Sequence, residues 1–249
     1  IISDYQTVPV GFGPIYKRYY LSELFMDCSG TTYWAPVKEW SDFYFIERKN
    51  YDDYVLRAYN SGTLKTVLPN LLYSDFNYNF ETSYFTAINQ RHELLRLRLN
   101  DPAAQAEKIA ENVAGFTSGY ATDDLYYFAS PQEDYSGYPL SGNLPLELYH
   151  WQEQQPARLL QTYAEGHIYS LVRETAISPN GQHVYFTGSD GYCYYYTPGQ
   201  TPVLTMQNPL NGYRTFVSDS GVTYYLQYGS GEEGDSLFRV DRQTLTDIT

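Results

Sequence analysis

Short runs of alternating hydrophobic and polar residues, each centred on a pair of aromatic residues, recur along the chain. The pairs begin at Tyr44, Tyr84, Tyr127, Tyr185 and Tyr224, so that successive pairs lie 40, 43, 58 and 39 residues apart. Each pair is followed by a polar turn and a second alternating run, as in SYFTA followed by ELLRLRL. Alternation with a period of two predicts β-strands, and an interval of about 40 residues predicts one supersecondary unit repeated along the chain.

The repeats predict four strands each: an inner strand, a central hairpin and an outer strand. In one repeat RETAIS precedes Pro179-Asn180-Gly181, and an Asn-Gly pair between hydrophobic runs is a strong hairpin signal. Leu95, Leu97 and Leu99 alternate with arginines in ELLRLRL, which is a strand pattern. Helical chemistry is confined to the range 101–112, and there the repeat favours an outer strand from Lys108 to Val113, leaving at most one helical turn before it.

One such sheet leaves both faces partly uncovered, and a radial stack of sheets covers them while leaving only short edges. We therefore predict an all-β chain with the β-propeller fold, made of four-stranded antiparallel blades, six in number, with five as the next alternative. Residues 1–249 are expected to form a single domain, with repeats from about residue 32 onward. Residues 1–31 are expected to be irregular, to form a degraded blade, or to supply a strand that closes the ring. Two packed sandwich domains are the alternative architecture.

The amino-acid composition limits the classes of partner and location that are possible. The chain has 29 tyrosines, and 43% of its residues are hydrophobic, enough for a sizeable core. Its formal net charge of −13 excludes nucleic acid as the main partner, because phosphate binding needs a basic surface. No hydrophobic run reaches the roughly 20 residues of a membrane span, so we expect no membrane span within this chain. A leader or anchor upstream of Ile1 is compatible with these features.

The segment from Ile177 to Gly191, with its Ser-Pro-Asn-Gly turn before an aromatic strand, resembles the repeat of TolB-like and WD-type propellers. TolB-like blades carry Ser-Pro-Asp-Gly at this turn, and here Asn180 stands in place of Asp, which the turn tolerates equally. The tyrosine-rich repeat is also similar to that of uncharacterised extracytoplasmic propellers of Gram-positive bacteria, which are often tethered behind a membrane helix. The resemblance implies a binding or sensing ring outside the cytoplasm, tethered through an upstream segment, and it supplies no catalytic residues.

Motifs for metal, cofactor or nucleophilic chemistry are absent from the sequence. The four histidines lack metal-ligand spacing, no G-x-S-x-G or phosphate-binding loop occurs, and we expect neither metal nor cofactor. Cys28 and Cys193 are expected to be separate buried thiols, with a disulfide as the alternative. Glu232-Glu233-Gly234-Asp235 is expected to be a solvated hairpin tip, since it lacks the spacing of a calcium loop.

Binding is the function that these features favour. Loops on a rigid scaffold usually carry binding, and exposed tyrosine gives contact area at low entropic cost. We predict a non-enzymatic module that recognises a protein, peptide or cell-wall glycan at one mouth of the propeller channel. The candidate residues, beside acidic residues of the loops, are Tyr51, Tyr73, Tyr163, His167, Tyr169 and Tyr213.

Two other functions stay open. One is a glycoside hydrolase, which would need carboxylates that converge in one cavity. Its candidate residues are Asp42, Asp75, Asp124, Glu174 and Asp219, all near the ends of predicted inner strands. The other is a structural spacer in a larger surface protein.

Overall fold

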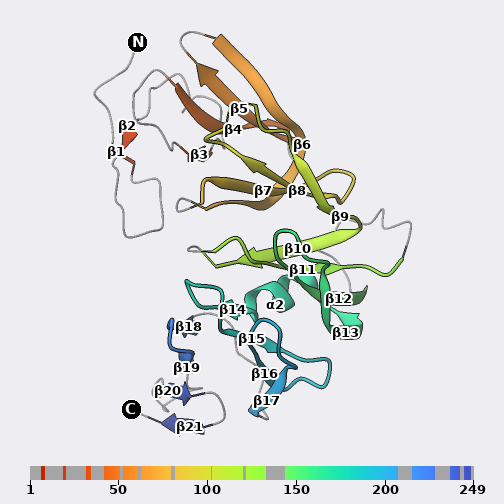
Figure 1. Ribbon diagram of the computed structural model, residues 1–249, viewed down its shortest axis with the longest axis vertical. Coiled ribbons are helices and arrows are strands. Elements are labelled where there is room, and N and C mark those ends of the chain that lie inside the picture. The colour runs from red at the N-terminus through yellow and green to blue at the C-terminus, as the bar shows by residue number, and fades with distance from the viewer. Residues whose placement is uncertain are drawn as a thin grey trace. The chain divides into compact units, whose positions relative to one another are not determined.

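The structure is a computed structural model that describes residues 7–8, 19–20, 32–34, 42–50, 53–60, 63–79, 82–101, 103–119, 122–132, 144–206, 215–227, 236–241 and 244–247 (Figure 1). The chain divides into two compact units, Ile1–Glu111 and Asn112–Thr249, and each is described by itself. Strands dominate the described part of both units, and the strand pairs described there are antiparallel. In the ranges given above, no helix combines the length and hydrophobicity that a membrane crossing requires.

Unit 1 contains a two-stranded ladder and a seven-stranded sheet whose strands follow chain order. The ladder pairs β1 (Thr7–Val8) with β2 (Tyr19–Tyr20). The sheet consists of β3 (Thr32–Trp34), β4 (Asp42–Asn50), β5 (Asp53–Asn60), β6 (Thr63–Asn79), β7 (Tyr84–Asn89), β8 (Leu94–Arg98) and β9 (Glu107–Ala110).

Strand β6 belongs to two four-stranded groups. It pairs with β5 as far as Leu71 and, after a register shift, with β7 from Phe76 to Asn79. The groups β3–β6 and β6–β9 thus each contain an inner strand, a hairpin and an outer strand, as the repeat predicts. With the sheets of unit 2 the described strands form five such groups, and the blade number of the whole protein stays a prediction.

Strand β8 confirms the strand predicted from ELLRLRL, but its burial does not follow the alternation. Arg96 is only 2% exposed, although it lies between leucines. Its guanidinium carbon lies 3.4 Å from the centre of the Tyr84 ring, a cation–π contact that lets the charge be buried. The outer strand expected over Lys108–Val113 is β9, which ends at Ala110, and Val113 already begins the next sheet.

Unit 2 contains three four-stranded antiparallel sheets, again in chain order. Each sheet takes its four described strands from one continuous stretch of sequence. Sheet A comprises β10 (Val113–Ser118), β11 (Leu125–Ala129), β12 (Leu144–Trp151) and β13 (Arg158–Gly166). Sheet B comprises β14 (Ala176–Ile177), β15 (Val184–Thr187), β16 (Cys193–Tyr196) and β17 (Val203–Met206). Sheet C comprises β18 (Thr215–Val217), β19 (Val222–Gln227), β20 (Ser236–Asp241) and β21 (Thr244–Asp247).

The hairpin predicted at Asn180-Gly181 is confirmed and recurs in sheet C. In sheet B the Ser178 amide donates to His183 O over 2.8 Å, and Gly181 adopts a φ of +72° that favours glycine. In sheet C the Ser218 amide donates to Val222 O over 2.8 Å, and Gly221 has a φ of +83°. The two turns therefore hold equivalent places between the first and second strands of their sheets.

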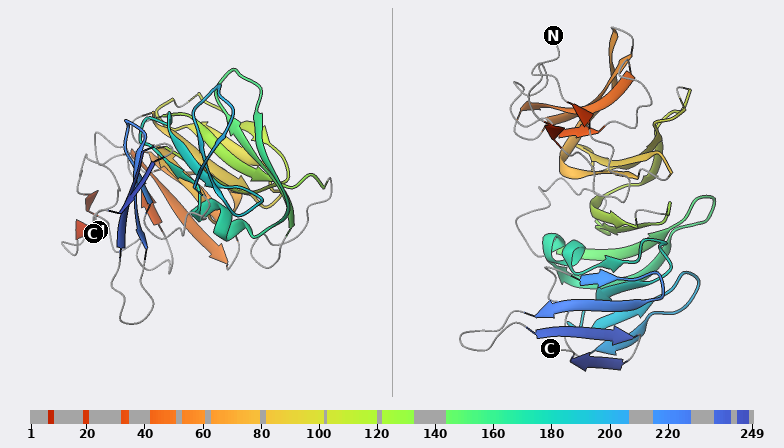
Figure 2. Two further views of the ribbon diagram at one scale, coloured as in Figure 1. Left: turned by 90° about the horizontal axis from the view of Figure 1, so that it is seen from below. Right: turned by 90° about the vertical axis from the view of Figure 1, so that its left-hand side faces the viewer.

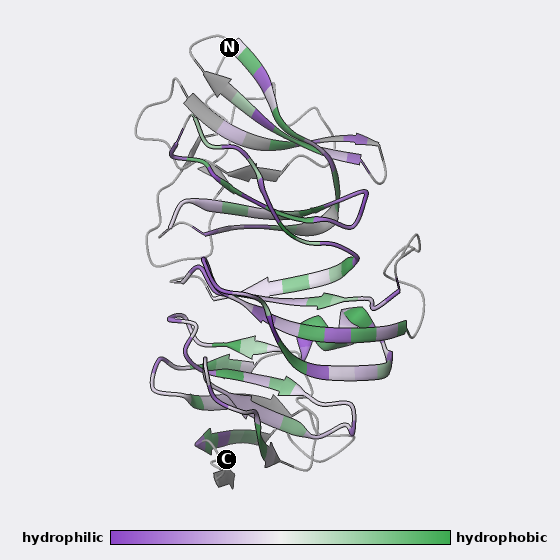
Figure 3. Cartoon of the chain, turned by 45° about the vertical axis from the view of Figure 1, so that its right-hand side comes forward, coloured by the Kyte–Doolittle hydropathy of each residue, from purple (hydrophilic) through white to green (hydrophobic). Residues whose placement is uncertain are grey.

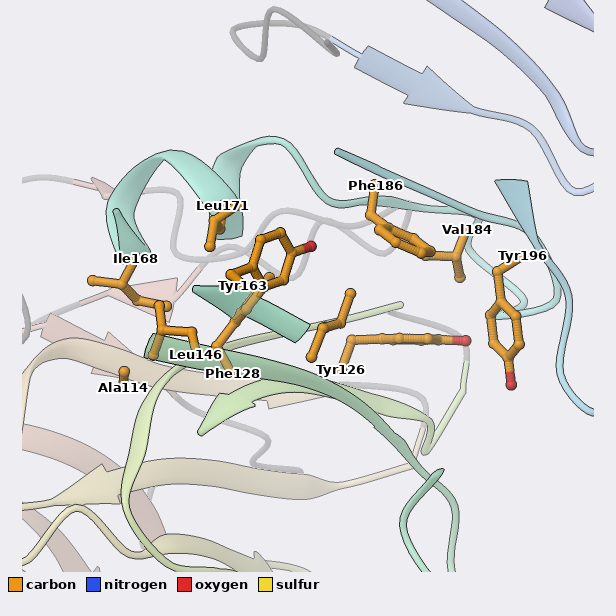
Figure 4. Close-up of a cluster of buried hydrophobic side chains, with 11 residues drawn as sticks. Ala114, Tyr126, Phe128, Leu146, Tyr163, Ile168, Leu171, Val184, Phe186 and Tyr196 are labelled. Carbon is orange, nitrogen blue, oxygen red and sulfur yellow. The ribbon is translucent and has the colours of Figure 1, made fainter. Parts of the chain in front are cut away.

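The sheets of unit 2 pack face to face in chain order (Figure 2). Between sheets A and B lies the larger core, shown in Figure 4, which contains Ala114, Tyr126, Phe128, Leu146, Leu148, Tyr163, Ile168, Leu171, Val184, Phe186 and Tyr196. Between sheets B and C lies a smaller one, with Tyr185, Cys193, Val217 and Val240 buried. This stacking is what the repeat predicts, because each sheet covers a face of the next.

A short helix, α2 (Ile168–Arg173), connects sheets A and B and was not predicted. Its hydrophobic side, with Ile168 and Leu171 buried, packs on β10, and Figure 3 shows its hydrophobic character. The contact is close, because a Cβ added to Gly115 of β10 would lie 3.0 Å from Val172 Cγ2. The helix is therefore fixed on the core by its buried face and presents its other face outward.

Candidate functional site

Tyrosine hydroxyls connect sheet A to a turn of sheet B, and sheet B to a turn of sheet C. Tyr126 in β11 donates to the carbonyl of Gly181 over 3.3 Å, and Tyr185 in β15 donates to the carbonyl of Gly221 over 2.6 Å. Both tyrosines are buried in the second strand of their sheets, and both glycines lie in the equivalent hairpin turns. We call these two contacts the tyrosine ties. They fix the distance between neighbouring sheets at the turn end of the inner strands.

A buried polar array lies beside the first tie. His150 of β12 is 4% exposed, and its ring stacks on Tyr126 with centroids 4.6 Å apart. His150 Nδ1 lies 3.0 Å from the hydroxyl of Tyr196, and His150 Nε2 lies 3.8 Å from Asp124 Oδ2. Gln152 Nε2 donates to Asp124 Oδ1 over 2.9 Å. If Tyr196 donates to Nδ1, the histidine proton lies on Nε2 and faces the carboxylate. The 3.8 Å to Asp124 Oδ2 is too long for a hydrogen bond, so this buried pair has no hydrogen bond of its own.

The order hydroxyl, imidazole, carboxylate in this array is that of a nucleophilic triad, but its surroundings favour a structural role. Tyr196, His150 and Asp124 are all buried, so no substrate meets the hydroxyl. Burial raises the pKa of Tyr196, which keeps its hydroxyl protonated and weakly nucleophilic. Because Tyr196 belongs to sheet B and the other two residues to sheet A, the array links the two sheets through hydrogen bonds.

The candidate carboxylates occupy different places. Asp124 is buried before β11, and Asp219 lies in the first turn of sheet C, where its Oδ1 accepts a hydrogen bond of 2.9 Å from the amide of Asn180. Glu174 follows α2 and precedes β14, at the opposite end of the inner strand, and burial raises its pKa. The side chains of Asp42 and Asp75 lie outside the described residues. Within the described ranges, no three acidic, histidine or cysteine residues form a metal-binding cluster.

The candidate aromatic residues also separate into a buried and an exposed group. Tyr163 is 3% exposed and donates to Thr187 O over 2.7 Å, so its ring packs between sheets A and B. Tyr169 on α2 is 47% exposed. Tyr51 and Tyr213 lie outside the described residues, and so does the side chain of Tyr73.

Tyr169 and Arg173 meet on the outward face of α2, and the exposed residue His167 precedes its first turn; we call these three residues the α2 surface. The Arg173 guanidinium carbon lies 3.7 Å from the centre of the Tyr169 ring, and Arg173 also donates to its hydroxyl. His167 is the exposed N-cap residue, with Nδ1 3.5 Å from Ser170 Oγ. His167 and Tyr169 are among the candidates named from the sequence, but Arg173 is not. The signal for Arg173 is its spacing of four residues from Tyr169, which becomes informative only on a helix.

The thiol and the remaining imidazoles offer no further reactive centre in the described part of the chain. Cys193 is a buried free thiol whose pKa burial raises to about 12, and Cys28 lies outside the described residues. His92 is buried in its turn, and His183 stacks on Tyr195 with its Nδ1 2.5 Å from the tyrosine hydroxyl.

Comparison with known proteins identifies the fold. No protein-family model and no curated protein sequence matches the chain. Among solved structures, an oligogalacturonate lyase in complex with manganese is similar over 84% of this chain and 62% of its own, with 11% identity and a TM-score of 0.55. The oligogalacturonate lyase of Vibrio parahaemolyticus is similar over 84% of this chain and 61% of its own, with 10% identity and a TM-score of 0.52.

TolB from Acinetobacter baumannii is similar over 84% of this chain and 51% of its own, with 8% identity and a TM-score of 0.46. The chain thus spans about three fifths of the length of the two lyases. At these identities the likeness shows the fold alone. With its repeated four-stranded antiparallel sheets, the chain has the β-propeller fold.

Proposed function

We propose that this chain is a non-enzymatic binding propeller that acts outside the cytoplasm and recognises a protein, peptide or cell-wall glycan through the α2 surface. The observation that carries the proposal is the setting of Tyr169, a half-exposed aromatic ring held against a guanidinium on a helix whose other face is buried in the core. The extracytoplasmic location and an upstream tether rest on the resemblance to TolB-like and Gram-positive propellers.

The α2 surface has the physical properties of a binding platform. Ile168 and Leu171 hold the helix on the core, and the close approach of Gly115 leaves little room for it to shift. The Tyr169 ring can be covered by a partner at a low entropic cost, since tyrosine has few rotatable bonds. Arg173 adds hydrogen-bond donors for carbonyl, carboxylate or hydroxyl oxygens of the partner. An apolar ring face beside fixed donors fits both a sugar ring and a peptide.

The charge of the whole molecule limits the partner. With a net charge of −13, the protein attracts cationic molecules and repels strongly anionic ones at long range, so a neutral or cationic partner is favoured. Association with a cationic partner should therefore weaken as salt screens the charges. Arg173 acts only at short range, where it orients the partner against Tyr169.

The test compares Tyr169→Ala with Tyr192→Ala, since Tyr192 is a tyrosine of sheet B that is also exposed, at 38%. Binding of soluble peptidoglycan fragments and of a library of unstructured peptides would be measured by calorimetry at low and high salt. Loss of an interface tyrosine should weaken the binding by roughly 30-fold, equivalent to ~2 kcal/mol. Tyr192→Ala should bind like the wild type. Equal binding by both variants would refute the role of the α2 surface, and no binding by any form would favour the spacer function.

One observation supports the glycoside hydrolase alternative. Burial raises the pKa of Glu174, as a catalytic acid requires. The other described candidates, Asp124 and Asp219, lie at the opposite end of the inner strands, so a second carboxylate would have to come from elsewhere. Release of chromophore from aryl glycosides by the wild type, abolished in Glu174→Gln, would establish the enzyme; an inactive wild type would end this alternative.

A further inference from the structure

The turn between β14 and β15 contains one of the most labile dipeptides in protein chemistry, Asn180-Gly181. In such a pair the glycine amide nitrogen attacks Cγ of the asparagine and a new C–N bond forms. The bond between Cγ and Nδ2 then breaks, with release of ammonia, and water opens the cyclic imide to aspartate or isoaspartate. Glycine favours the attack because it has no side chain to hinder it. Asn180 and its neighbour Gln182 are partly or fully exposed, so water reaches the turn.

Hydrogen bonds within the turn oppose this reaction. The Gly181 amide, which is the nucleophile, already donates to Ser178 O over 2.9 Å. The side-chain oxygen of Asn180 accepts from Ser178 Oγ over 2.7 Å and from the Gln182 amide over 3.0 Å. For the attack, the Gly181 nitrogen must leave its acceptor and the Asn180 side chain must turn away from two donors.

Asp219 on the neighbouring sheet completes the restraint. Its carboxylate accepts a hydrogen bond of 2.9 Å from the Asn180 amide, and its main-chain oxygen accepts one of 3.3 Å from Asn180 Nδ2, the nitrogen that would leave. These two bonds hold both the backbone and the side chain of Asn180 from sheet C. We propose that Asn180 is a deamidation site that Asp219 protects, and that Asn180 becomes reactive when sheet C moves away from sheet B.

The reaction would not stay local. A carboxylate at position 180 loses the donor to Asp219 O and places a negative charge beside the Asp219 carboxylate, and like charges this close repel. An isoaspartate also lengthens the main chain immediately before Gly181, whose carbonyl accepts the tie from Tyr126. Deamidation therefore weakens the contacts of sheet B with both of its neighbours. The turn would then not regain its original hydrogen bonds.

The experiment follows isoaspartate and aspartate at position 180 by peptide mass spectrometry during warm incubation at neutral pH. Fragmentation separates this site from the second Asn-Gly pair, Asn211-Gly212, which lies outside the described residues. The wild type, Asp219→Ala and Ser220→Ala are compared with the protein in denaturant. Ser220 is the matched control, because its hydroxyl contacts Ser218.

We expect slow conversion in the wild type and in Ser220→Ala, and conversion faster by roughly ten-fold or more in Asp219→Ala, the scale of losing a hydrogen bond to a charged group. Asp219→Asn keeps an acceptor for the Asn180 amide and should restore most of the protection. Asp219→Ser is the second truncation if Asp219→Ala does not fold. A wild type that converts as fast as the denatured protein overturns the proposal, as does a folded truncation variant that converts at the wild-type rate.

Discussion

The two tyrosine ties differ in length, and this difference predicts a difference in stability. Tyr185→Phe removes a donor that lies 2.6 Å from Gly221 O, whereas Tyr126→Phe removes one that lies 3.3 Å from Gly181 O. Phenylalanine keeps the ring, so no cavity forms and the change isolates the hydroxyl. A buried hydrogen bond of good geometry contributes about 1–1.5 kcal/mol net, and a long one less, about 0.5 kcal/mol. We expect Tyr185→Phe to be the more destabilising by about 0.5–1 kcal/mol.

Urea unfolding measures this difference, with the midpoint and slope fitted by linear extrapolation. Replacing Trp34 and Trp40 by phenylalanine leaves Trp151 of β12 as the sole tryptophan, so the fluorescence reports on unit 2. Tyr194→Phe is the control, because its hydroxyl reaches only the exposed carboxylate of Asp190 and its loss should cost under ~0.5 kcal/mol. If Tyr126→Phe proves as costly as Tyr185→Phe, the lengths of the ties do not set their strengths. If neither variant differs from the control, the ties do not hold the sheets together.

Three further outcomes follow from the structure. Gly221 and Gly199 both have a φ of +83°, but a Cβ on Gly221 would lie 2.7 Å from a histidine nitrogen while Gly199 has nothing within 4 Å. Gly221→Ala should therefore lower the free energy of unfolding by ~1–3 kcal/mol more than Gly199→Ala, and equal losses would contradict the clash. Burial raises the pKa of Cys193 to about 12, so in a Cys28→Ser background a thiol reagent should label it only after unfolding; labelling of the folded protein would disprove its burial. Burial also raises the pKa of Tyr127 to about 12, above the ~10 of an unfolded tyrosine. The stability from this raised pKa is complete below pH ~10 and is lost as the pH rises towards 12, so the urea midpoint should fall across that window, and a flat midpoint would show that the shift is absent.

The sequence predicted the strand groups well because their signals are local. The hairpin at Asn180-Gly181 depends on the left-handed conformation that glycine adopts without strain, and the dipeptide alone is enough to predict it. Alternation identified β8 in the same way. The burial of individual tyrosines could not be predicted from local sequence. Tyr163 faces a neighbouring sheet whereas Tyr169 faces solvent, and this difference arises only from the packing of the sheets.

Helix α2 and strand β6 show where local reasoning ends. The helix has no acidic residue in its first turn and no side-chain cap, so the usual start signals are missing, and tertiary packing on β10 supplies its stability. Strand β6 continues past Pro69 and past Asn70, which has a φ of 57°, where sequence rules predict a break. The array of Asp124, His150 and Tyr196 joins residues that are far apart in sequence, and only the packing of two sheets reveals it.

The acceptors of the tyrosine ties have a consequence for how such a protein changes during evolution. Each tyrosine hydroxyl donates to a main-chain oxygen, an atom that every amino acid carries. Substitutions near the contact can therefore accumulate without removing the hydrogen bond. The contact itself uses the hydroxyl of one tyrosine and the carbonyl of one glycine that has a positive φ. The sequence around these contacts can therefore diverge widely while the architecture of the stacked sheets persists.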